Sequence, residues 1–162
     1  MACGMKWVVL IAAAIAAVDQ CTKALVVCFL QPSEHRVVID GFFNLVNWRN
    51  TGAAWGIFQN YNVVLTLISA LTVLVLYFFR HSFQLERKAS RVALGLIGGG
   101  IIGNLVDRVR VHSVIDFLDF HVNGWHWPAF NVADSAICVG VVLYIIVSWQ
   151  RDGETHVKQP VL

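Results

Sequence analysis

The chain has 162 residues, of which 57% are hydrophobic and 14% are charged, and its net charge is +2. A typical soluble domain is about 25% charged, and a chain of this length could not bury so much apolar surface in a water-soluble core. The small net charge also argues against nucleic-acid binding. These values indicate a small integral membrane protein.

Four apolar stretches are each close to the roughly 20 residues that a helix needs to cross a bilayer. The first contains polar residues near its middle, but its apolar character then resumes, which favours a retained helix over a cleaved signal peptide. The sequence shows no internal repeat and no linker. We predict one membrane domain over 1–162, with transmembrane helices at about 7–30, 61–79, 92–111 and 132–149.

The distribution of Lys and Arg predicts the orientation of these helices. Seven of these residues lie before the first span, in the segment 80–91 or in the tail 150–162. The loops 31–60 and 112–131 carry only Arg36 and Arg49. The positive-inside rule therefore places both termini in the cytoplasm and both long loops outside.

The two outer loops are too long to be simple turns. Loop 31–60 alternates β-branched and aromatic residues with polar ones, which predicts short strands, followed by a small membrane-surface element at Gly52 to Phe58. Loop 112–131 is rich in the aromatic residues that favour a lipid headgroup boundary. The predicted fold class is an all-α membrane protein with a small outer β-structure and a surface helix element.

Polar side chains lie inside two of the predicted spans. Asp19 and Lys23 are four residues apart in the first helix, which is the favourable order for an ion pair. A charged group at mid-membrane costs about 2.5–3.5 kcal/mol, so we expect the two to neutralise each other, or to neutralise Arg108, in a structural role.

Small residues form a stripe along the third predicted helix. Gly95, Gly99 and Gly103 stand four residues apart, so they share one face and admit a neighbouring helix closely. The stripe leads to a polar cluster at the outer end of the helix, made of Asn104, Asp107 and Arg108. Such a cluster is more than helix packing requires.

Two acidic residues are expected at the outer end of the helical bundle. Asn131 can cap the fourth helix with Asp134 as its third residue, close to a capping box. Asp116 follows the third helix, which ends at the same membrane boundary, so the two carboxylates could share one site. Asp119 is an alternative partner, because spacing alone does not choose between it and Asp116.

Two close carboxylates cannot both ionise easily and hold one proton between them over much of the acidic-to-neutral range. The ionised member can take a proton from water while the protonated member donates to a scissile carbonyl. Such a pair suits peptide hydrolysis, and we expect neither a metal nor another cofactor.

Five short motifs occur in order along the chain, and they are DQCTK (Asp19 to Lys23), RNTGAAW (Arg49 to Trp55), GNLVDR (Gly103 to Arg108), VIDF (Val114 to Phe117) and FNVADS (Phe130 to Ser135). Together they resemble bacterial lipoprotein signal peptidase, also called signal peptidase II, a four-helix aspartic endopeptidase of the inner membrane. Trp55 departs from the Phe that is common there, and the second helix carries no motif.

The resemblance implies roles for particular residues. Asp116 and Asp134 would be the catalytic pair, which selects Asp116 over Asp119. The residues expected to line the pocket and support the substrate are Asn50, Gly52, Asn104, Arg108 and Asn131. The polar residues expected to have structural roles are Asp19, Lys23 and Asp107.

The resemblance also implies a substrate and a location. The substrates would be prolipoproteins whose Cys already carries diacylglyceryl, cleaved immediately before that Cys. Loop 31–60 would form a small periplasmic β-cradle, and the active site would lie near the periplasmic face, in contact with membrane lipid. Globomycin, a cyclic depsipeptide, would be expected to block the catalytic pair.

The same residues also admit other functions. A metal-dependent intramembrane hydrolase could use His112, His121 and His126 with the two aspartates, since His112 and Asp116 are spaced for a helical ligand pair. A small transporter or channel subunit could use the polar residues of the first and third helices as an ion path. The glycine stripe would also suit a purely structural membrane-assembly protein.

Overall fold

The computed structural model describes residues 2–53, 55 and 57–156. Within these ranges four helices are long and apolar enough to cross a membrane, as predicted. They are α1 (Ala2–Phe29), α2 (Asn62–Phe78), α3 (Lys88–Val111) and α4 (Val132–His156), and α2 is extended by a short 3-10 helix, η2 (Phe79–His81). Three helices are longer than predicted, because α1 begins at Ala2 rather than near Trp7, α3 begins at Lys88 rather than near Val92, and α4 continues to His156 rather than ending near Trp149.

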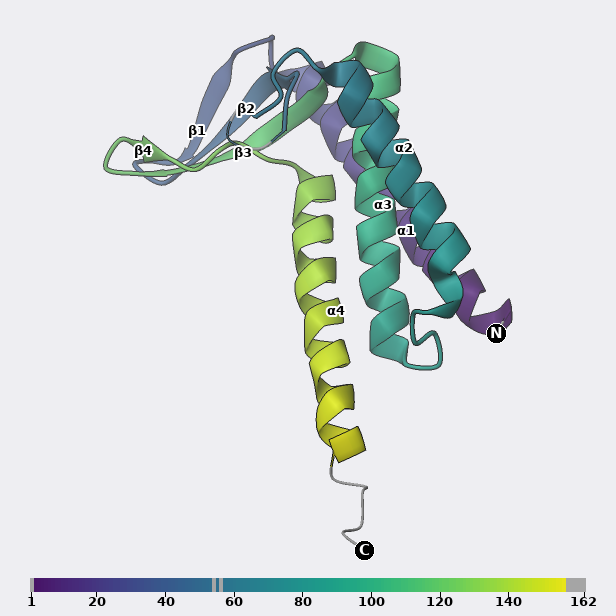
Figure 1. The fold of residues 1–162 in the computed structure, drawn as a ribbon. Coiled ribbons are helices and arrows are strands. Elements are labelled where there is room, and N and C mark those ends of the chain that lie inside the picture. Colours follow the sequence, from purple (N-terminus) through teal and green to yellow (C-terminus); the bar gives the residue numbers. More distant parts are fainter. Residues whose placement is uncertain (1, 54, 56, 157–162) are drawn as a thin grey trace, which may run out of the picture.

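Helix α3 is the centre of the bundle. It packs against α1 and α4 along most of its length and against α2 on a third side (Figure 1). The predicted glycine stripe is the reason, because a Cβ added at Gly99 would lie 2.7 Å from the carbonyl oxygen of Ala12 in α1. On another face of α3, a Cβ added at Gly100 would overlap the carbonyl oxygen of Ala133 in α4.

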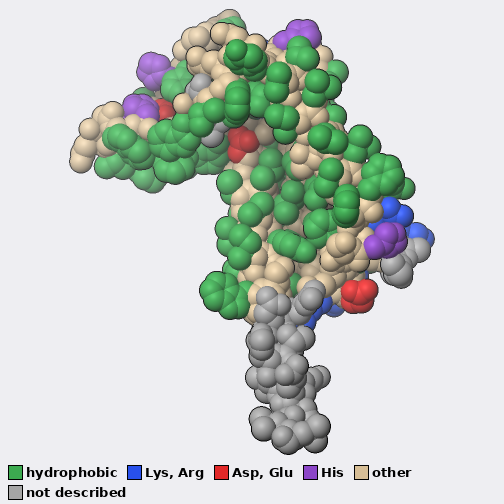
Figure 2. Space-filling model, viewed as in Figure 1, with side chains coloured by type: hydrophobic (Ala, Val, Ile, Leu, Met, Phe, Trp, Pro, Cys, Tyr) green, Lys and Arg blue, Asp and Glu red, His purple; other side chains and the backbone are tan. Residues whose placement is uncertain are grey.

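The outer surface of the bundle is apolar. Figure 2 shows hydrophobic side chains covering the face of the helices that it presents, with Lys and Arg gathered at the end away from the sheet. Leu67 of α2 is 64% exposed and Trp149 of α4 is 78% exposed. Such extensive exposure is stable only where lipid covers the helices.

A four-stranded antiparallel sheet projects sideways from the other end of the bundle (Figure 1). Its strands, in spatial order, are β1 (His35–Ile39), β2 (Phe43–Asn50), β3 (Val114–Val122) and β4 (Trp125–His126). The strands predicted in loop 31–60 are confirmed. The all-α fold class and the reading of loop 112–131 as an aromatic boundary loop are too simple, because that loop forms β3 and β4.

Backbone pairing and ring stacking explain why loop 112–131 becomes part of the sheet. β3 pairs with β2 over most of its length, which supplies partners to backbone groups that would otherwise need water. Its aromatic residues also pack on β2 and its neighbours, since Phe120 stacks on Phe43 at 4.7 Å and on Phe130 at 5.8 Å between ring centroids. The aromatic side chains therefore hold the sheet together.

A one-residue bulge in β2 sets the register near the bundle. Leu45 pairs with Leu118, but Trp48 pairs with Asp116, so one extra residue of β2 is accommodated between them. Within the bulge, the side-chain amide of Asn47 donates to the carbonyl oxygen of Leu30 at the end of α1, at 2.9 Å. The bulge thus anchors the sheet to the bundle.

The surface helix element expected at Gly52 to Phe58 includes residues 54 and 56, which lie outside the described residues. Among the neighbouring residues that are described, Trp55 has a 3-10 helical conformation and the others form bends and turns. The N–H of Ala53 donates to the carbonyl oxygen of Ile57 at 2.7 Å. A Cβ at Gly52 would lie 2.8 Å from the same oxygen, so glycine permits this close turn.

Candidate active site

A cavity of about 510 Å³ opens where the sheet meets the ends of α3 and α4. Figure 2 shows an acidic patch in the hollow between the sheet and the helices. The polar residues expected at the site converge here, and those that line the cavity are Asn50, Gly52, Asn104, Arg108, Asp116 and Asp134. Asn131 is fully buried directly behind it.

Asp134 is fixed by the start of α4. Its backbone N–H donates to the side-chain oxygen of Asn131 at 2.9 Å, and its Oδ2 accepts from the N–H of Asn131 at 3.3 Å. This reciprocal pair confirms the predicted capping box. The other carboxylate oxygen, Oδ1, accepts from Nδ2 of Asn104 in α3 at 2.7 Å. Two helices therefore orient this carboxylate.

Asp116 lies on β3 and is only 4% exposed. Its Oδ1 accepts from Nδ2 of Asn131 at 2.8 Å, and its Oδ2 accepts from Nδ2 of Asn50 in β2 at 2.9 Å. Asn50 is itself fixed, because its side-chain oxygen accepts from the N–H of Gly52 at 2.9 Å. Both oxygens of Asp116 are therefore held by amide donors.

The environment of Asp116 favours its protonated form. Burial is the largest cause, and with the nearby charge of Asp134 it raises the pKa of Asp116 from 3.8 to about 7. The hydrogen bonds from Asn50 and Asn131 oppose this shift, because they stabilise the ionised carboxylate. Asp116 can therefore carry a proton in the range in which an acid catalyst works at neutral pH.

Asn131 and Asn104 connect the two acidic residues. Nδ2 of Asn131, which donates to Asp116, also lies 3.2 Å from Oδ1 of Asn104, and Asn104 donates to Asp134. The two carboxylates thus belong to one hydrogen-bonded group that spans α3, α4 and β3. This is the proximity expected from the sequence, since Asp134 is near enough to influence the pKa of Asp116.

Asp119, the alternative partner, lies elsewhere in the sheet. It is three residues from Asp116 on a regular strand, so the two side chains point to opposite faces. Its carboxylate is buried, with Oδ2 accepting from Asn44 at 3.0 Å and Oδ1 lying 2.8 Å from Nδ1 of His126. It does not line the cavity.

A buried ionic cluster supports the cavity from within the bundle. Lys23 lies 2.8 Å from Asp19 and 2.8 Å from Asp107, and it donates to Oδ1 of Asn104 at 2.9 Å. The expected pairing of Asp19 with Lys23 is confirmed. Because Lys23 also holds Asn104, the cluster is linked directly to the residue that orients Asp134.

Asp19 has a second contact that the sequence did not reveal. Its Oδ1 accepts from the backbone N–H of Ala133 at 2.9 Å, so α1 supplies an acceptor to the first turn of α4. Gln20, to which we assigned no role, donates to Asp107 at 2.8 Å and to the carbonyl oxygen of Gly103 at 3.1 Å. These contacts join residues far apart in sequence.

Arg108 connects α3 to the segment that follows β2 and borders the cavity at Gly52. One of its nitrogens, Nη2, donates to the carbonyl oxygen of Gly52 at 3.2 Å. Its guanidinium is also near enough to interact electrostatically with Asp134 and Asp116. Arg108 therefore places a positive charge beside both acidic residues, rather than serving as the partner of Asp19.

Two indole rings that the sequence did not assign to the site also line the cavity. Trp55 and Trp127 meet edge to face with their centroids 5.3 Å apart, joining the segment after β2 to the segment after β4. The aromatic richness of loop 112–131 is the sequence signal for Trp127, but the same composition favours a lipid headgroup boundary.

The metal alternative loses its geometric basis. His112 ends α3 with a left-handed backbone conformation (φ 56°), and Asp116 lies on a strand, so they do not form a helical ligand pair. Among the residues that the structure describes, no group of three or more His, Cys, Asp or Glu side chains could hold a metal ion.

Comparison with known proteins identifies the family. The sequence profile described as signal peptidase (SPase) II matches residues 11–150. The chain belongs to the signal peptidase II family. Members of this family are peptidases, and the cavity that holds the buried Asp116 and the half-buried Asp134 is the candidate active site.

Individual relatives agree with this assignment. A lipoprotein signal peptidase of Syntrophotalea carbinolica is 48% identical over 150 residues, covering 91% of this chain and 92% of the relative. One from Bacillus pumilus is 41% identical over 128 residues, covering 79% and 83%. A solved structure described as a bacterial membrane enzyme, determined by the in meso method, has a TM-score of 0.83 and 32% identity, covering 96% of this chain and 94% of that chain.

Proposed function

We propose that this signal peptidase II removes signal peptides from prolipoproteins by cleaving before a diacylglyceryl-modified Cys, with Asp116 and Asp134 as the catalytic pair. Relatives that the chain matches over most of its length are lipoprotein signal peptidases, which supports the reaction. The observation that carries the catalytic assignment is the sharing of Asn131 by both carboxylates at the edge of one cavity.

The chemistry follows from one proton shared by two carboxyl groups. The ionised member, which we assign to Asp134, takes a proton from a water molecule. The oxygen of that water molecule attacks the scissile carbonyl carbon at the same time. The protonated member, Asp116, donates its proton to the carbonyl oxygen, giving a neutral gem-diol. Proton transfer from Asp134 to the Cys nitrogen then accompanies cleavage of the C–N bond, and Asp116 recovers its proton from the diol.

The surrounding polar residues would orient the reacting groups. Asn50 and Asn131 hold Asp116, and Asn104 holds Asp134, so neither carboxyl group is free to rotate away from the substrate. The guanidinium of Arg108 would restrain the ionised carboxylate and the substrate backbone near Gly52. The cluster of Asp19, Lys23 and Asp107 has a structural role, because its charges are paired and buried.

The position of the cavity suits a lipid-anchored substrate. Its wall includes Ile137 and Cys138, which follow Asp134 along the transmembrane helix α4, and the two indole rings of Trp127 and Trp55. A diacylglyceryl group embedded in the adjacent leaflet would bring its peptide bond to the level of the carboxylates. The cavity would likewise accept a globomycin-type inhibitor that places a polar group between them.

We assign the cavity end of the bundle to the periplasmic side of the bacterial inner membrane, with both termini in the cytoplasm. The support is the gathering of Lys and Arg at the end away from the sheet (Figure 2), which the positive-inside rule places in the cytoplasm. This orientation presents the site to lipoproteins after their export.

Separate replacement of the two carboxylates tests the catalytic assignment. Purified Asp116→Asn and Asp134→Asn variants should each lose at least about 10³-fold in turnover on a diacylglyceryl-modified prolipoprotein, since each removes one partner of the proton transfer. Asp40→Asn, an exposed outer residue, is the matched control and should retain activity. Near-normal turnover by either Asp116→Asn or Asp134→Asn would contradict the assignment.

A chelator distinguishes this mechanism from the metal alternative. Because water is activated by carboxyl groups, turnover should be the same before and after dialysis against a strong chelator. A loss that added divalent metal restores would support the metal-dependent hydrolase instead.

A further inference from the structure

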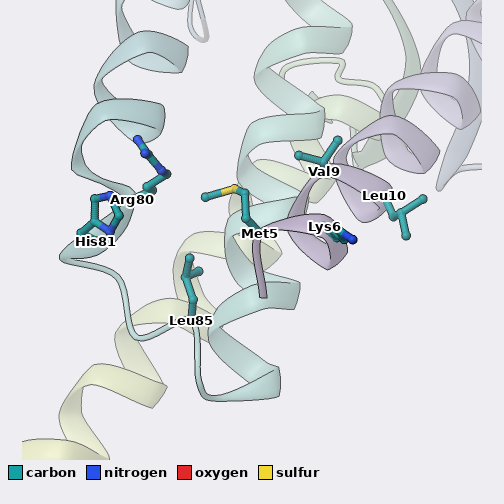
Figure 3. Close-up of a pocket in the computed structure, with 7 residues that line it drawn as sticks. All are labelled: Met5, Lys6, Val9, Leu10, Arg80, His81 and Leu85. Atoms are coloured by element: carbon teal, nitrogen blue, oxygen red, sulfur yellow. The ribbon is translucent and has the colours of Figure 1, made fainter. Parts of the chain in front are cut away.

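A second groove, of about 690 Å³, lies at the end of the bundle away from the candidate active site. Figure 3 shows residues of the first turns of α1, of η2 and of the loop after η2 around it. Its apolar side chains are Met5, Val9, Leu10 and Leu85, and its basic side chains are Lys6, Arg80 and His81. The proposed peptidase mechanism uses none of these residues.

The groove lies where α1 and α2 are separated. Both helices pack on α3, but over the described residues no Cα atom of α1 lies within 8 Å of a Cα atom of α2. The loop that follows α2 closes the end of the groove, since a Cβ added at Gly4 would lie 2.9 Å from the carbonyl oxygen of Leu85. The groove is therefore closed at one end and open laterally toward the bilayer.

The walls of the groove suit a hydrocarbon chain. Val9 and Leu10 are each 59% exposed although they lie in a transmembrane helix. In a bilayer this surface must be covered by apolar groups. A peptide segment in the same place would have to satisfy its own backbone N–H and C=O groups, whereas an acyl chain carries no such groups.

The rim of the groove suits an anion. Arg80 is held in place, because Nη1 donates to the carbonyl oxygen of Tyr77 at 2.8 Å and its guanidinium carbon lies 4.6 Å from the centre of the Tyr77 ring. An arginine has five N–H donors, so most remain available to a phosphate. In the described part of the chain, no carboxylate pairs with Arg80, His81 or Lys6.

We propose that this groove binds an anionic phospholipid, with the phosphate near Arg80 and His81, Lys6 on the opposite rim, and one acyl chain between α1 and α2. The combination carries the proposal: a basic rim that no carboxylate of the described residues pairs with borders an apolar gap that opens sideways at the membrane boundary. The site lies in the leaflet opposite the candidate active site, which is the cytoplasmic leaflet in the proposed orientation. It does not depend on the catalytic assignment.

Lipid binding to the purified full-length chain in a neutral detergent tests this proposal. Phosphatidylglycerol and phosphatidylcholine with identical acyl chains are titrated, and bound lipid is counted by native mass spectrometry. Phosphatidylglycerol should bind about tenfold more tightly, as expected for basic residues near an anionic headgroup. Lys6→Gln/Arg80→Gln should reduce its affinity to that of phosphatidylcholine.

A matched variant and two further probes make the test specific. Lys88→Gln/Arg110→Gln removes the same charge outside the groove and should retain the preference for phosphatidylglycerol. Val9→Trp fills the apolar gap and should weaken binding of both lipids. Glycerol phosphate, which has no acyl chain, should not compete.

Three results would overturn the proposal. The first is equal affinity of the unmodified protein for the two lipids. The second is an equal loss of preference in the matched variant, which would mean that net charge alone attracts the lipid. The third is effective competition by glycerol phosphate, which would indicate a site for free phosphate.

Discussion

Nδ2 of Asn131 lies 2.8 Å from Oδ1 of Asp116, so the residue that caps α4 also holds the carboxylate of β3. One asparagine thus performs two separable tasks. Its side-chain oxygen starts the helix that carries Asp134, and its side-chain nitrogen orients Asp116. This division makes it possible to test the second task while preserving the first.

Asn131→Ser should separate these two tasks. Serine is also a good helix cap, so the thermal stability of the variant should stay close to that of the unmodified protein, whereas Asn131→Ala should lose about 1 kcal/mol. Neither residue can donate an amide hydrogen bond to Asp116. We expect turnover to fall at least about tenfold in Asn131→Ser, because the carboxyl group loses one of its two amide donors.

The pH profile shows whether Asn131 acts through Asp116. Its hydrogen bond lowers the pKa of Asp116, which burial raises to about 7. In the unmodified protein, kcat/KM should therefore decline as the pH rises above this range and Asp116 loses its proton. In Asn131→Ser this decline should move to higher pH. Reduced turnover with an unchanged profile would mean that Asn131 has only a packing role.

The pKa of Asp116 also predicts how folding stability depends on pH. An unfolded chain releases this proton near pH 3.8, whereas the folded protein retains it to about pH 7. Between these values the folded state binds more protons, so the free energy of unfolding decreases as the pH rises. The stabilisation is fully present below about pH 4 and is lost by about pH 7, with a slope of at most about 1.4 kcal/mol per pH unit.

Asp116→Asn removes this titration. In detergent, the melting temperature of the unmodified protein should fall between pH 4.5 and pH 7.5 relative to that of the variant, so the variant becomes comparatively more stable at the higher pH. Asp40→Asn serves as the control, because Asp40 is exposed. Parallel melting curves for the unmodified protein and Asp116→Asn across this range would show that the pKa of Asp116 is not raised by folding.

Local spacing was enough to predict several features of the site. Asn131 and Asp134 are three residues apart, and Asp19 and Lys23 are four apart, so the geometry of a single helix brings each pair together. The glycine stripe likewise indicated a close helix contact without any knowledge of the fold. These predictions succeeded because each depended on the regular repeat of one helix.

Contacts between distant segments could not be predicted in the same way. Asn50 reaches Asp116 only because a bulge in β2 shifts the register of its pairing with β3. The contact of Asp19 with the N–H of Ala133 depends on how closely α1 and α4 approach α3. Neither bulge nor helix separation has a local sequence signal, and the strand-forming residues of loop 112–131 resembled a membrane boundary.

Gly103 offers a test of the close contact between α3 and α1. A Cβ at this position would lie 2.6 Å from Oδ2 of Asp19, the oxygen that pairs with Lys23. Gly103→Ala should therefore displace that carboxylate and destabilise the protein by about 1–3 kcal/mol. Gly98→Ala is the matched control, because its added Cβ would meet only the Cβ of Ala12, at 4.0 Å.

Unfolding in detergent would compare the two glycine variants. Gly98→Ala should be neutral or slightly stabilising, since alanine favours the helical conformation more than glycine does. Gly103→Ala should melt several degrees lower and lose activity, because Lys23 also holds Asn104. Equal stability of both variants would show that the contact at Gly103 can relax without cost.

Lys23 balances two buried carboxylates, and its removal should be more harmful than the loss of a surface charge. The side chain is 1% exposed and lies 2.8 Å from both Asp19 and Asp107. Lys23→Met retains much of the side-chain volume but leaves both carboxylates without their cation, which should destabilise the protein by about 3–5 kcal/mol. Adding Asp107→Asn to this variant removes one of those charges, so the double variant should be more stable than Lys23→Met alone. Chemical unfolding in mixed micelles measures both values, and an additive loss in the double variant would show that the cluster is not electrostatically coupled.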